Sequence, residues 1–222
     1  MIGEPLPRSV LAADVLDAAH RLLGCVLQAD TADGTVAVRL VEVEAYRGDD
    51  DPASHCYRGR TPRNAVMWGP AGYLYTYFVY GMHFCANVVC LTEGVPGAVL
   101  VRAGEVVSDL GVARLRRPTA RRDRDLASGP ARLAALLGLG RESNGIDLTD
   151  PSSPVRLLAG APVPPELVRT GPRVGVSTAM TRPWRYWIDD SPAVSPYRAA
   201  VARPRRNPVA TVRNDRGCER TT

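Results

Sequence analysis

The sequence contains no lysine, and all 28 of its basic residues are arginine. This absence excludes a lysine Schiff base, a lysine general base and the lysine of a phosphate-binding loop. Histidine is scarce, at three residues, and the five cysteines include no CxxC pair. The usual spacings of a zinc site are therefore missing, and we expect reduced, mostly buried thiols and neither a metal nor another cofactor.

Long apolar runs are also absent. No stretch approaches the roughly 18 consecutive apolar residues of a transmembrane helix, and the N-terminus lacks the pattern of a secretion signal. Hydrophobic residues make up 45% and charged residues 23% of the 222 positions, which is typical of a globular protein with one core. We expect a cytoplasmic monomer with no membrane contact, in which 1–201 form one domain and 202–222 a basic mobile tail.

Periodicity and turn residues predict a chain rich in strands, with few helices. Helical patterns occupy 14–23, 107–116 and 128–137, and strand patterns occupy 25–29, 35–46, 73–80, 83–91, 98–103, 155–158, 173–177 and 185–189. The Gly- and Pro-rich stretch 47–72 indicates a long ordered loop, and Gly81 predicts a hairpin with Tyr80 near its tip.

Strand 35–46 carries two glutamates two residues apart. Alternation places Leu40, Glu42, Glu44 and Tyr46 on one face. Two carboxylates at about 7 Å could raise each other's pKa if partly buried, which would leave one as a general base. The alternative is a pair of solvated charges on an exposed face.

Nine of the 13 aromatic residues lie between positions 46 and 84, together with arginines 47, 58, 60 and 63. Tyrosines interleaved with arginines suit flat bases attached to phosphates and favour nucleic-acid binding. The net charge of +5 points the same way. The alternative is a sheet core that uses tyrosine for its β-propensity.

Several motifs follow one another in the order of one enzyme family. They are 41–46 (VEVEAY), 54–55 (SH), 60–64 (RTPRN), 72–82 (GYLYTYFVYGM), Asn87 and 97–103 (GAVLVRA), with weaker matches at 128–133 and 173–176. Over about residues 7–195 the chain resembles the 3-methyladenine (alkyladenine) DNA glycosylases, the type lacking a helix-hairpin-helix. The resemblance implies a mixed α/β (α+β) fold, a compact single domain with a curved antiparallel sheet flanked by helices.

The resemblance also implies an activity. Such enzymes flip a damaged purine out of double-stranded DNA and hydrolyse its glycosidic bond. By resemblance, Glu44 is the general base that activates water, Arg102 positions that water, and the backbone carbonyl of Val174 is a further water ligand. For Arg102 the alternative is a surface salt bridge.

Further residues match the family's base pocket and DNA contacts. Tyr46, His55 and Tyr77 would enclose the flipped base, and an electron-poor alkylated purine stacks well on tyrosine. Asn87 would obstruct the exocyclic amine of guanine, or be a buried strand residue bonded to backbone. Tyr80 matches the side chain that wedges into the space left by the flipped nucleotide, and Met82 flanks it. Arg63 and Asn64 are candidates for contact with the DNA backbone, or plain loop residues.

The missing lysine makes the implied enzyme monofunctional, since strand cleavage usually proceeds through a lysine Schiff base. The expected product is an intact abasic site. Cationic lesions such as 3-methyladenine and 7-methylguanine need little leaving-group assistance, whereas hypoxanthine and ethenoadenine need a proton donor that the sequence does not identify. The 55–64 loop is one residue shorter than is usual in the family, the 87–102 turn is longer, and His83 replaces a common tyrosine.

Three other functions remain open. The chain could recognise lesions, or bind nucleic acid, without excising a base, although a binder needs neither Glu44 nor Arg102. It could be a metal-dependent hydrolase using His55, Cys56 and Cys85 together with His83. It could also be a self-resistance glycosylase for bulky adducts of a DNA-alkylating antibiotic.

Overall fold

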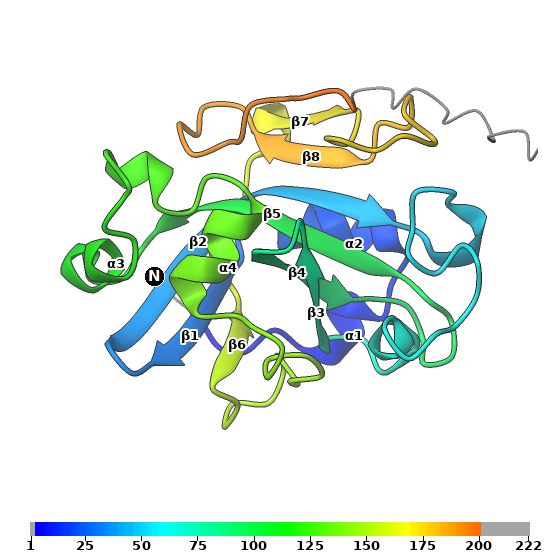
Figure 1. Ribbon diagram of the computed structural model, residues 1–222, viewed down its shortest axis with the longest axis horizontal. Coiled ribbons are helices and arrows are strands. Elements are labelled where there is room, and N and C mark those ends of the chain that lie inside the picture. Colours follow the sequence, from blue (N-terminus) through cyan, green and yellow to red (C-terminus); the bar gives the residue numbers. More distant parts are fainter. Residues whose placement is uncertain (1–2, 201–222) are drawn as a thin grey trace, which may run out of the picture.

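Eight strands form one antiparallel sheet in the computed structural model, which describes residues 3–200. They are β1 (Val26–Thr31), β2 (Gly34–Tyr46), β3 (Leu74–Val79), β4 (His83–Val89), β5 (Ala98–Val106), β6 (Val155–Leu158), β7 (Val168–Gly171) and β8 (Arg185–Ile188). The main order is β3-β4-β5-β2-β1-β6, and β8 pairs with both β2 and β7. Figure 1 shows that the sheet is strongly curled. The expected α+β fold with a curved antiparallel sheet is confirmed, and the expected tail 202–222 lies outside the described residues.

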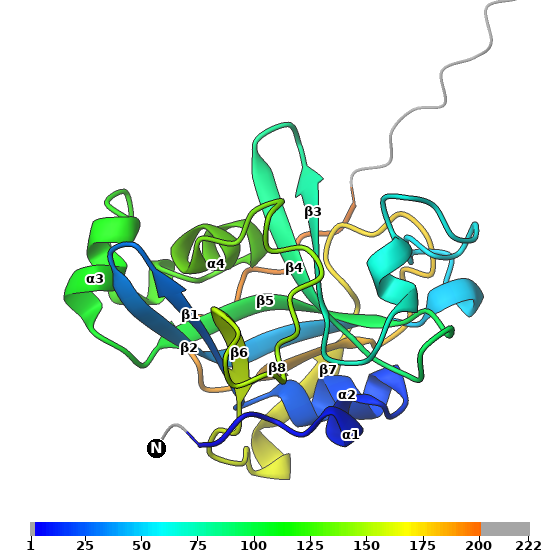
Figure 2. The same cartoon turned by 90° about the horizontal axis from the view of Figure 1, so that it is seen from below.

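Four α-helices cover the sheet in the described part of the chain: α1 (Arg8–Leu11), α2 (Val15–Leu22), α3 (Leu110–Arg116) and α4 (Pro130–Leu137). In Figure 2, α1 and α2 lie on one side of β2 and β5, and α4 lies on the other. The Asp14 carboxylate accepts the Leu16 N–H at 2.9 Å and begins α2. Helix α4 begins with Pro130 and ends at Gly138, whose φ of +68° favours glycine.

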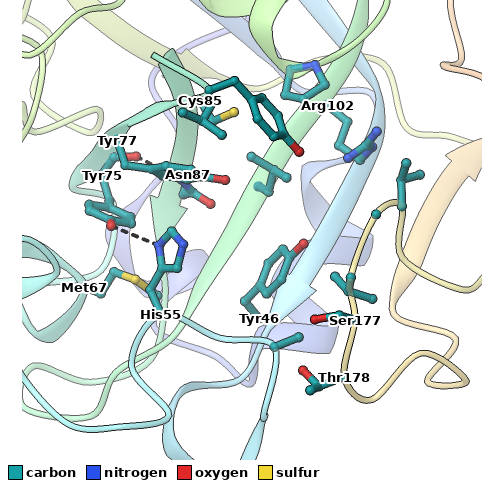
Figure 3. A pocket seen from close by; sticks show the side chains of 18 of the residues that line it. Tyr46, His55, Met67, Tyr75, Tyr77, Cys85, Asn87, Arg102, Ser177 and Thr178 are labelled. Atoms are coloured by element: carbon teal, nitrogen blue, oxygen red, sulfur yellow. Dashed lines mark hydrogen bonds between the residues drawn. The ribbon is translucent and has the colours of Figure 1, made fainter. Parts of the chain in front are cut away.

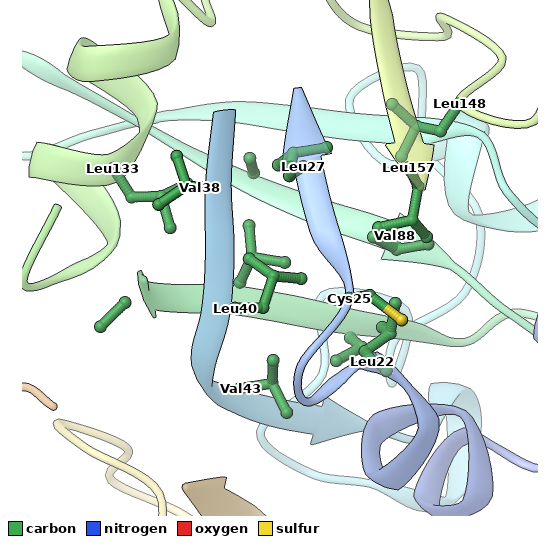
Figure 4. Packing of buried hydrophobic residues seen from close by; sticks show 14 of the residues in the cluster. Leu22, Cys25, Leu27, Val38, Leu40, Val43, Val88, Leu133, Leu148 and Leu157 are labelled. Atoms are coloured by element: carbon green, nitrogen blue, oxygen red, sulfur yellow. The ribbon is translucent and has the colours of Figure 1, made fainter. Parts of the chain in front are cut away.

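Strand β2 forms the centre of the sheet because it pairs with β1, β5 and β8. Its pairing with β5 shifts register between Leu40 and Val43, which is a β-bulge. Before the bulge, Val38 and Leu40 face the main core; after it, Val43 and Ala45 do (Figure 4). The bulge reverses the alternation, so the prediction that Leu40 shares a face with Glu42 and Glu44 is wrong.

Strands β3 and β4 form a hairpin that extends well beyond the sheet (Figure 2). Its turn contains Tyr80 and Gly81 at φ +53° and +69°, as the sequence predicts for a tip. A left-handed conformation is strained for tyrosine, at about 1–2 kcal/mol. Tyr80 is nevertheless 84% exposed, so little packing offsets this strain, and strained residues are concentrated at functional sites.

The structure differs from the predicted secondary structure in three places. Residues 173–177 form turns and bends rather than a strand, and the strand of this region is β7, which pairs with β8. The predicted loop 47–72 contains two short 3-10 helices, Gly48–Asp50 and Ala65–Trp68. Helix α1 was not predicted, because its one turn is too short to show periodicity. None of the helices in residues 3–200 is long and apolar enough to cross a membrane.

Candidate active site

A pocket of about 360 Å³ lies between the β3–β4 hairpin, β2, β5, the loop 47–72 and the segment 174–178. In Figure 3, His55, Tyr75 and Tyr77 lie together on one wall, and Tyr46 and Arg102 lie across from them. The lining includes Tyr46, His55, Tyr75, Tyr77, Tyr80, Cys85, Asn87, Arg102, Pro130, Val174 and Ser177. Its volume is near the lower end of the roughly 300–1,000 Å³ typical of small-molecule sites, which suits a single base.

Glu44 is fully buried directly behind this lining. Its Oε1 accepts the Val174 N–H at 2.7 Å and lies 3.3 Å from the Arg102 guanidinium, while its Oε2 accepts the Tyr46 hydroxyl at 2.8 Å. All three contacting residues line the pocket. A carboxylate has about four acceptor sites, so these two hydrogen bonds leave acceptor capacity on both oxygens.

Glu42, two residues earlier, is buried in a closed network. It accepts the Nε–H groups of Arg102 and Arg185 at 2.9 and 2.7 Å, and the Ser195 N–H at 2.7 Å. Burial raises the pKa of Glu42, but the charges of the two arginines outweigh it and hold that pKa below its ordinary value. Mutual raising of the two carboxylate pKa values is therefore the wrong expectation for Glu42, which is committed to ion pairs.

Arg102 links the two carboxylates. It is buried, with Nε on Glu42 and a terminal nitrogen near Glu44, and it donates to the Ser195 hydroxyl at 3.2 Å. Burial disfavours its charge, but the two glutamates together raise the pKa of Arg102. The surface salt bridge that the sequence left open is excluded, and the guanidinium is fixed beside Glu44.

Tyr75 and Tyr77 form an aromatic wall with His55, and Tyr46 lies across the pocket from it. The His55 ring packs edge-on against Tyr77, with centroids 4.6 Å apart, and its Nδ1 lies 3.1 Å from the Tyr75 hydroxyl. Burial and the charge of Glu44 raise the pKa of Tyr46 well above its ordinary value, so its phenol remains protonated and donates to Glu44. Tyr75 was not predicted as a pocket residue, although it shares a strand face with Tyr77.

His55 stays neutral at pH 7 in this setting. Partial burial and the charge of Arg63 lower its pKa below the ordinary value of 6.5. The Arg63 guanidinium lies 5.7 Å from the centroid of the Tyr77 ring. A neutral imidazole can donate one hydrogen bond and accept another, which suits the edge of a base.

Asn87 and Cys85 face the pocket from β4. The Asn87 amide donates to the Tyr75 carbonyl at 3.1 Å, so the predicted backbone bond of a buried strand asparagine is present, in a residue that also lines the pocket. Burial raises the pKa of the Cys85 thiol, which makes it an apolar, unreactive part of the wall.

A buried ion pair joins two walls of the pocket. Arg173 donates to both oxygens of Asp51, with one contact at 2.8 Å, and to the Ala45 carbonyl at 2.9 Å. Both side chains are fully buried, and the guanidinium lies 4.6 Å from the centroid of the Tyr46 ring. The pair fixes the residue before Val174, and thereby the N–H that binds Glu44.

The predicted DNA contacts have different positions. Tyr80 and Met82 project from the hairpin tip beside the pocket, 84% and 69% exposed. Arg63 is exposed on the loop. Asn64 is only 2% exposed; its amide donates to the carbonyls of His55 and Gly59, and its own oxygen accepts the Thr61 N–H. The expectation that Asn64 contacts DNA is therefore replaced by a role in ordering the loop.

Sequence reasoning missed several residues of this site. Asp51, Ser195 and Arg185 act through contacts with residues far away in the chain, so no local signal marks them. Tyr75 could have been found from the strand face that it shares with Tyr77. Within residues 3–200, no group of three histidine, cysteine or acidic side chains comes together as a metal site. The four residues considered for a metal hydrolase accordingly do not form one.

Comparisons with known proteins agree with the resemblance. The family model described as Methylpurine-DNA glycosylase (MPG) matches residues 9–192. A protein of Streptomyces avermitilis is 54% identical over 91% of this chain and 96% of its own, and one of Nocardia farcinica is 55% identical over 93% and 96%. A Mycobacterium tuberculosis protein is 48% identical over 88% and 96%. All three carry the name "Putative 3-methyladenine DNA glycosylase".

Proposed function

The chain belongs to the methylpurine-DNA glycosylase family, and on this basis we propose that it excises alkylated purines from double-stranded DNA with Glu44 as the general base. The observation that carries this proposal is the geometry of Glu44. It is a buried carboxylate held by two hydrogen bonds and the Arg102 guanidinium, with acceptor capacity left over, directly behind the lining of a pocket sized for one base.

Water is activated by this carboxylate. Glu44 takes a proton as the water attacks C1′ of the sugar, and its charge stabilises the oxocarbenium-like transition state. The Arg102 guanidinium lies 3.3 Å from Glu44 and directs N–H groups at the same region. The carbonyl of Val174 remains the proposed second ligand of the water, next to the N–H that binds Glu44.

The tyrosine wall supplies selectivity. Tyr46, Tyr77 and His55 enclose the flipped base. An alkylated, cationic purine gains cation–π attraction from the tyrosine rings. Stacking contributes about 1–3 kcal/mol per base, similar to the cost of flipping. Asn87 lies fixed on the wall by its bond to Tyr75 and obstructs the guanine amine.

Tyr80 fills the space that the flipped nucleotide leaves in the duplex. It is a large, exposed ring at the tip of a protruding hairpin, with exposed Met82 beside it. Apolar side chains that enter the minor groove in this way hold DNA bent and a base unstacked. Because the chain has no lysine, the product is an abasic site with both strands intact.

The test is excision from duplexes that each carry one lesion: 3-methyladenine, 7-methylguanine, hypoxanthine or ethenoadenine. Wild type and Glu44→Gln are compared in single-turnover reactions, and abasic sites are revealed by alkali. We expect excision by wild type and a loss of about 10²–10⁴-fold in the variant. The matched control is Glu105→Gln, a partly exposed glutamate on β5 paired with Arg39, which leaves the rate within about twofold.

Other outcomes would identify the competing functions. Tight binding to lesion DNA with no excision by wild type would favour a recognition protein. Loss of activity in EDTA would favour a metal-dependent hydrolase. Excision of bulky adducts alone would favour the self-resistance enzyme, and strand cleavage without alkali would overturn the monofunctional mechanism.

A further inference from the structure

The segment 114–132, which runs from the end of α3 into α4, is the most basic part of the described chain. It contains seven arginines and two aspartates, a net charge of +5 that equals the net charge of the whole chain. Both aspartates already bind arginines, Asp123 with Arg114 and Asp125 with Arg122, each at 2.9 Å. The segment therefore keeps cationic side chains whose charge its own carboxylates do not balance.

Three of these cationic side chains border a hollow of about 250 Å³ together with Thr119 and the paired Arg122 and Asp125. They are Arg117, Arg121 and Arg132. Nε of Arg117 is buried and has no hydrogen-bond partner among the described residues. Arg117 and Arg132 line the same hollow, and burial and the charge of Arg132 lower the pKa of Arg117. Convergent guanidinium groups with an unused donor suit an anion.

The segment ends at the rim of the active-site pocket. Pro130, the first residue of α4, lines that pocket, and the exposed Arg132 follows two residues later. In Figure 2, α4 lies on the same side of the sheet as the protruding β3–β4 hairpin. The basic surface thus continues the face that carries the pocket and the hairpin tip.

We propose that Arg117, Arg121 and Arg132 bind backbone phosphates of the duplex whose flipped nucleotide occupies the pocket. This inference rests on the proposed function, since it extends the DNA contact of that same site. The surface is arginine-rich and contains no exposed aromatic side chain for stacking, so it contacts phosphates and not bases. It adds affinity for every sequence equally and makes binding depend more steeply on salt.

The experiment compares two double variants that remove the same charge. Arg121→Gln/Arg132→Gln changes two exposed arginines of the proposed surface. Arg21→Gln/Arg169→Gln changes two exposed arginines on α2 and β7. In Figure 2 these two elements lie away from α4 and the β3–β4 hairpin. Binding to an undamaged duplex is measured as a function of salt, and excision is measured on the same duplex with one 7-methylguanine.

We expect the first variant to lose two phosphate contacts, which lowers the slope of log Kd against log salt by about 2. Raising the salt from about 50 to 200 mM then weakens its binding about tenfold less than it weakens the binding of wild type. Its excision rate at saturating enzyme stays that of wild type. Uncharged methylphosphonate linkages replace the phosphates near the lesion one at a time. A linkage that weakens the binding of wild type but not of this variant marks a phosphate that the two arginines contact.

Equal slopes for the two double variants would overturn the inference, as would a wild-type slope in the first one. A wild-type chain that excises no lesion, but binds duplex DNA through Arg121 and Arg132, would refute the proposed function and leave this inference standing. Loss of excision at saturating enzyme in the first variant alone would also overturn it, because a phosphate contact changes binding and not the chemical step.

Discussion

Replacing Asp51 by asparagine tests how the pocket walls are held together. The substitution keeps the shape of the side chain but leaves the Arg173 guanidinium buried without its counter-charge. Removing one partner of a fully buried ion pair costs about 3–5 kcal/mol. In a domain of this size, each kcal/mol shifts Tm by about 2–4 °C, so we expect a drop of about 6–20 °C.

The matched control is Asp189→Asn. Asp189 also binds one arginine, Arg169, at 2.9 Å, but both side chains are about half exposed, and such pairs contribute about 0.2–1 kcal/mol. Thermal unfolding followed by circular dichroism measures both variants. A drop for Asp51→Asn no larger than for Asp189→Asn would refute the reasoning, because the buried pair would then stabilise the fold no more than a surface pair.

Three further predictions concern the same site. Tyr80→Gly relieves the left-handed strain at the hairpin tip, so Tm stays equal or rises, while affinity for lesion DNA falls roughly 5- to 100-fold; a fall in Tm would contradict this. Because the folded-state pKa of Glu42 lies below its ordinary 4.5, the ionised form stabilises the fold above that pH. Wild type therefore loses unfolding free energy more steeply than Glu42→Gln as pH falls below 4.5, and parallel curves in acid denaturation would disprove it. Arg63→Ala raises the pKa of His55, since the Arg63 charge helps to lower it; an unchanged NMR titration of His55 would exclude that contact.

The strands and helices were largely predictable because their signals are local. Asp14 and Gly24 bracket the predicted helix around α2, and Gly81 marks the hairpin tip. The strand predicted at 173–177 failed for a tertiary reason. Alternating valines suggest a strand, but Arg173 is drawn into a buried pair with Asp51 and the Val174 N–H binds Glu44, so the backbone turns and does not pair.

The sequence predicted several residues that line the candidate site, but not which residues of the site form ion pairs and hydrogen bonds with one another. Motif resemblance indicated the pocket residues that line one face of the hairpin, such as Tyr77 and Asn87. Alternation placed Glu42 and Glu44 on one face but could not show that Arg102 and Arg185 pair with Glu42 while Glu44 lies behind the pocket lining. Asn64 shows the opposite case, since a polar side chain in a predicted surface loop is satisfied by three backbone groups.

The bulge in β2 has a consequence for how this protein can change over generations. Hydrophobic residues face the core on both sides of the bulge, at Leu40 and at Val43, although their positions differ in parity. Deleting or inserting one residue there would move either the core-facing side chains before the bulge, or Glu44 and its neighbours after it, to the opposite face of the strand. Descendants will therefore accumulate conservative replacements along β2, and length differences will collect in exposed turns such as the one around Gly94.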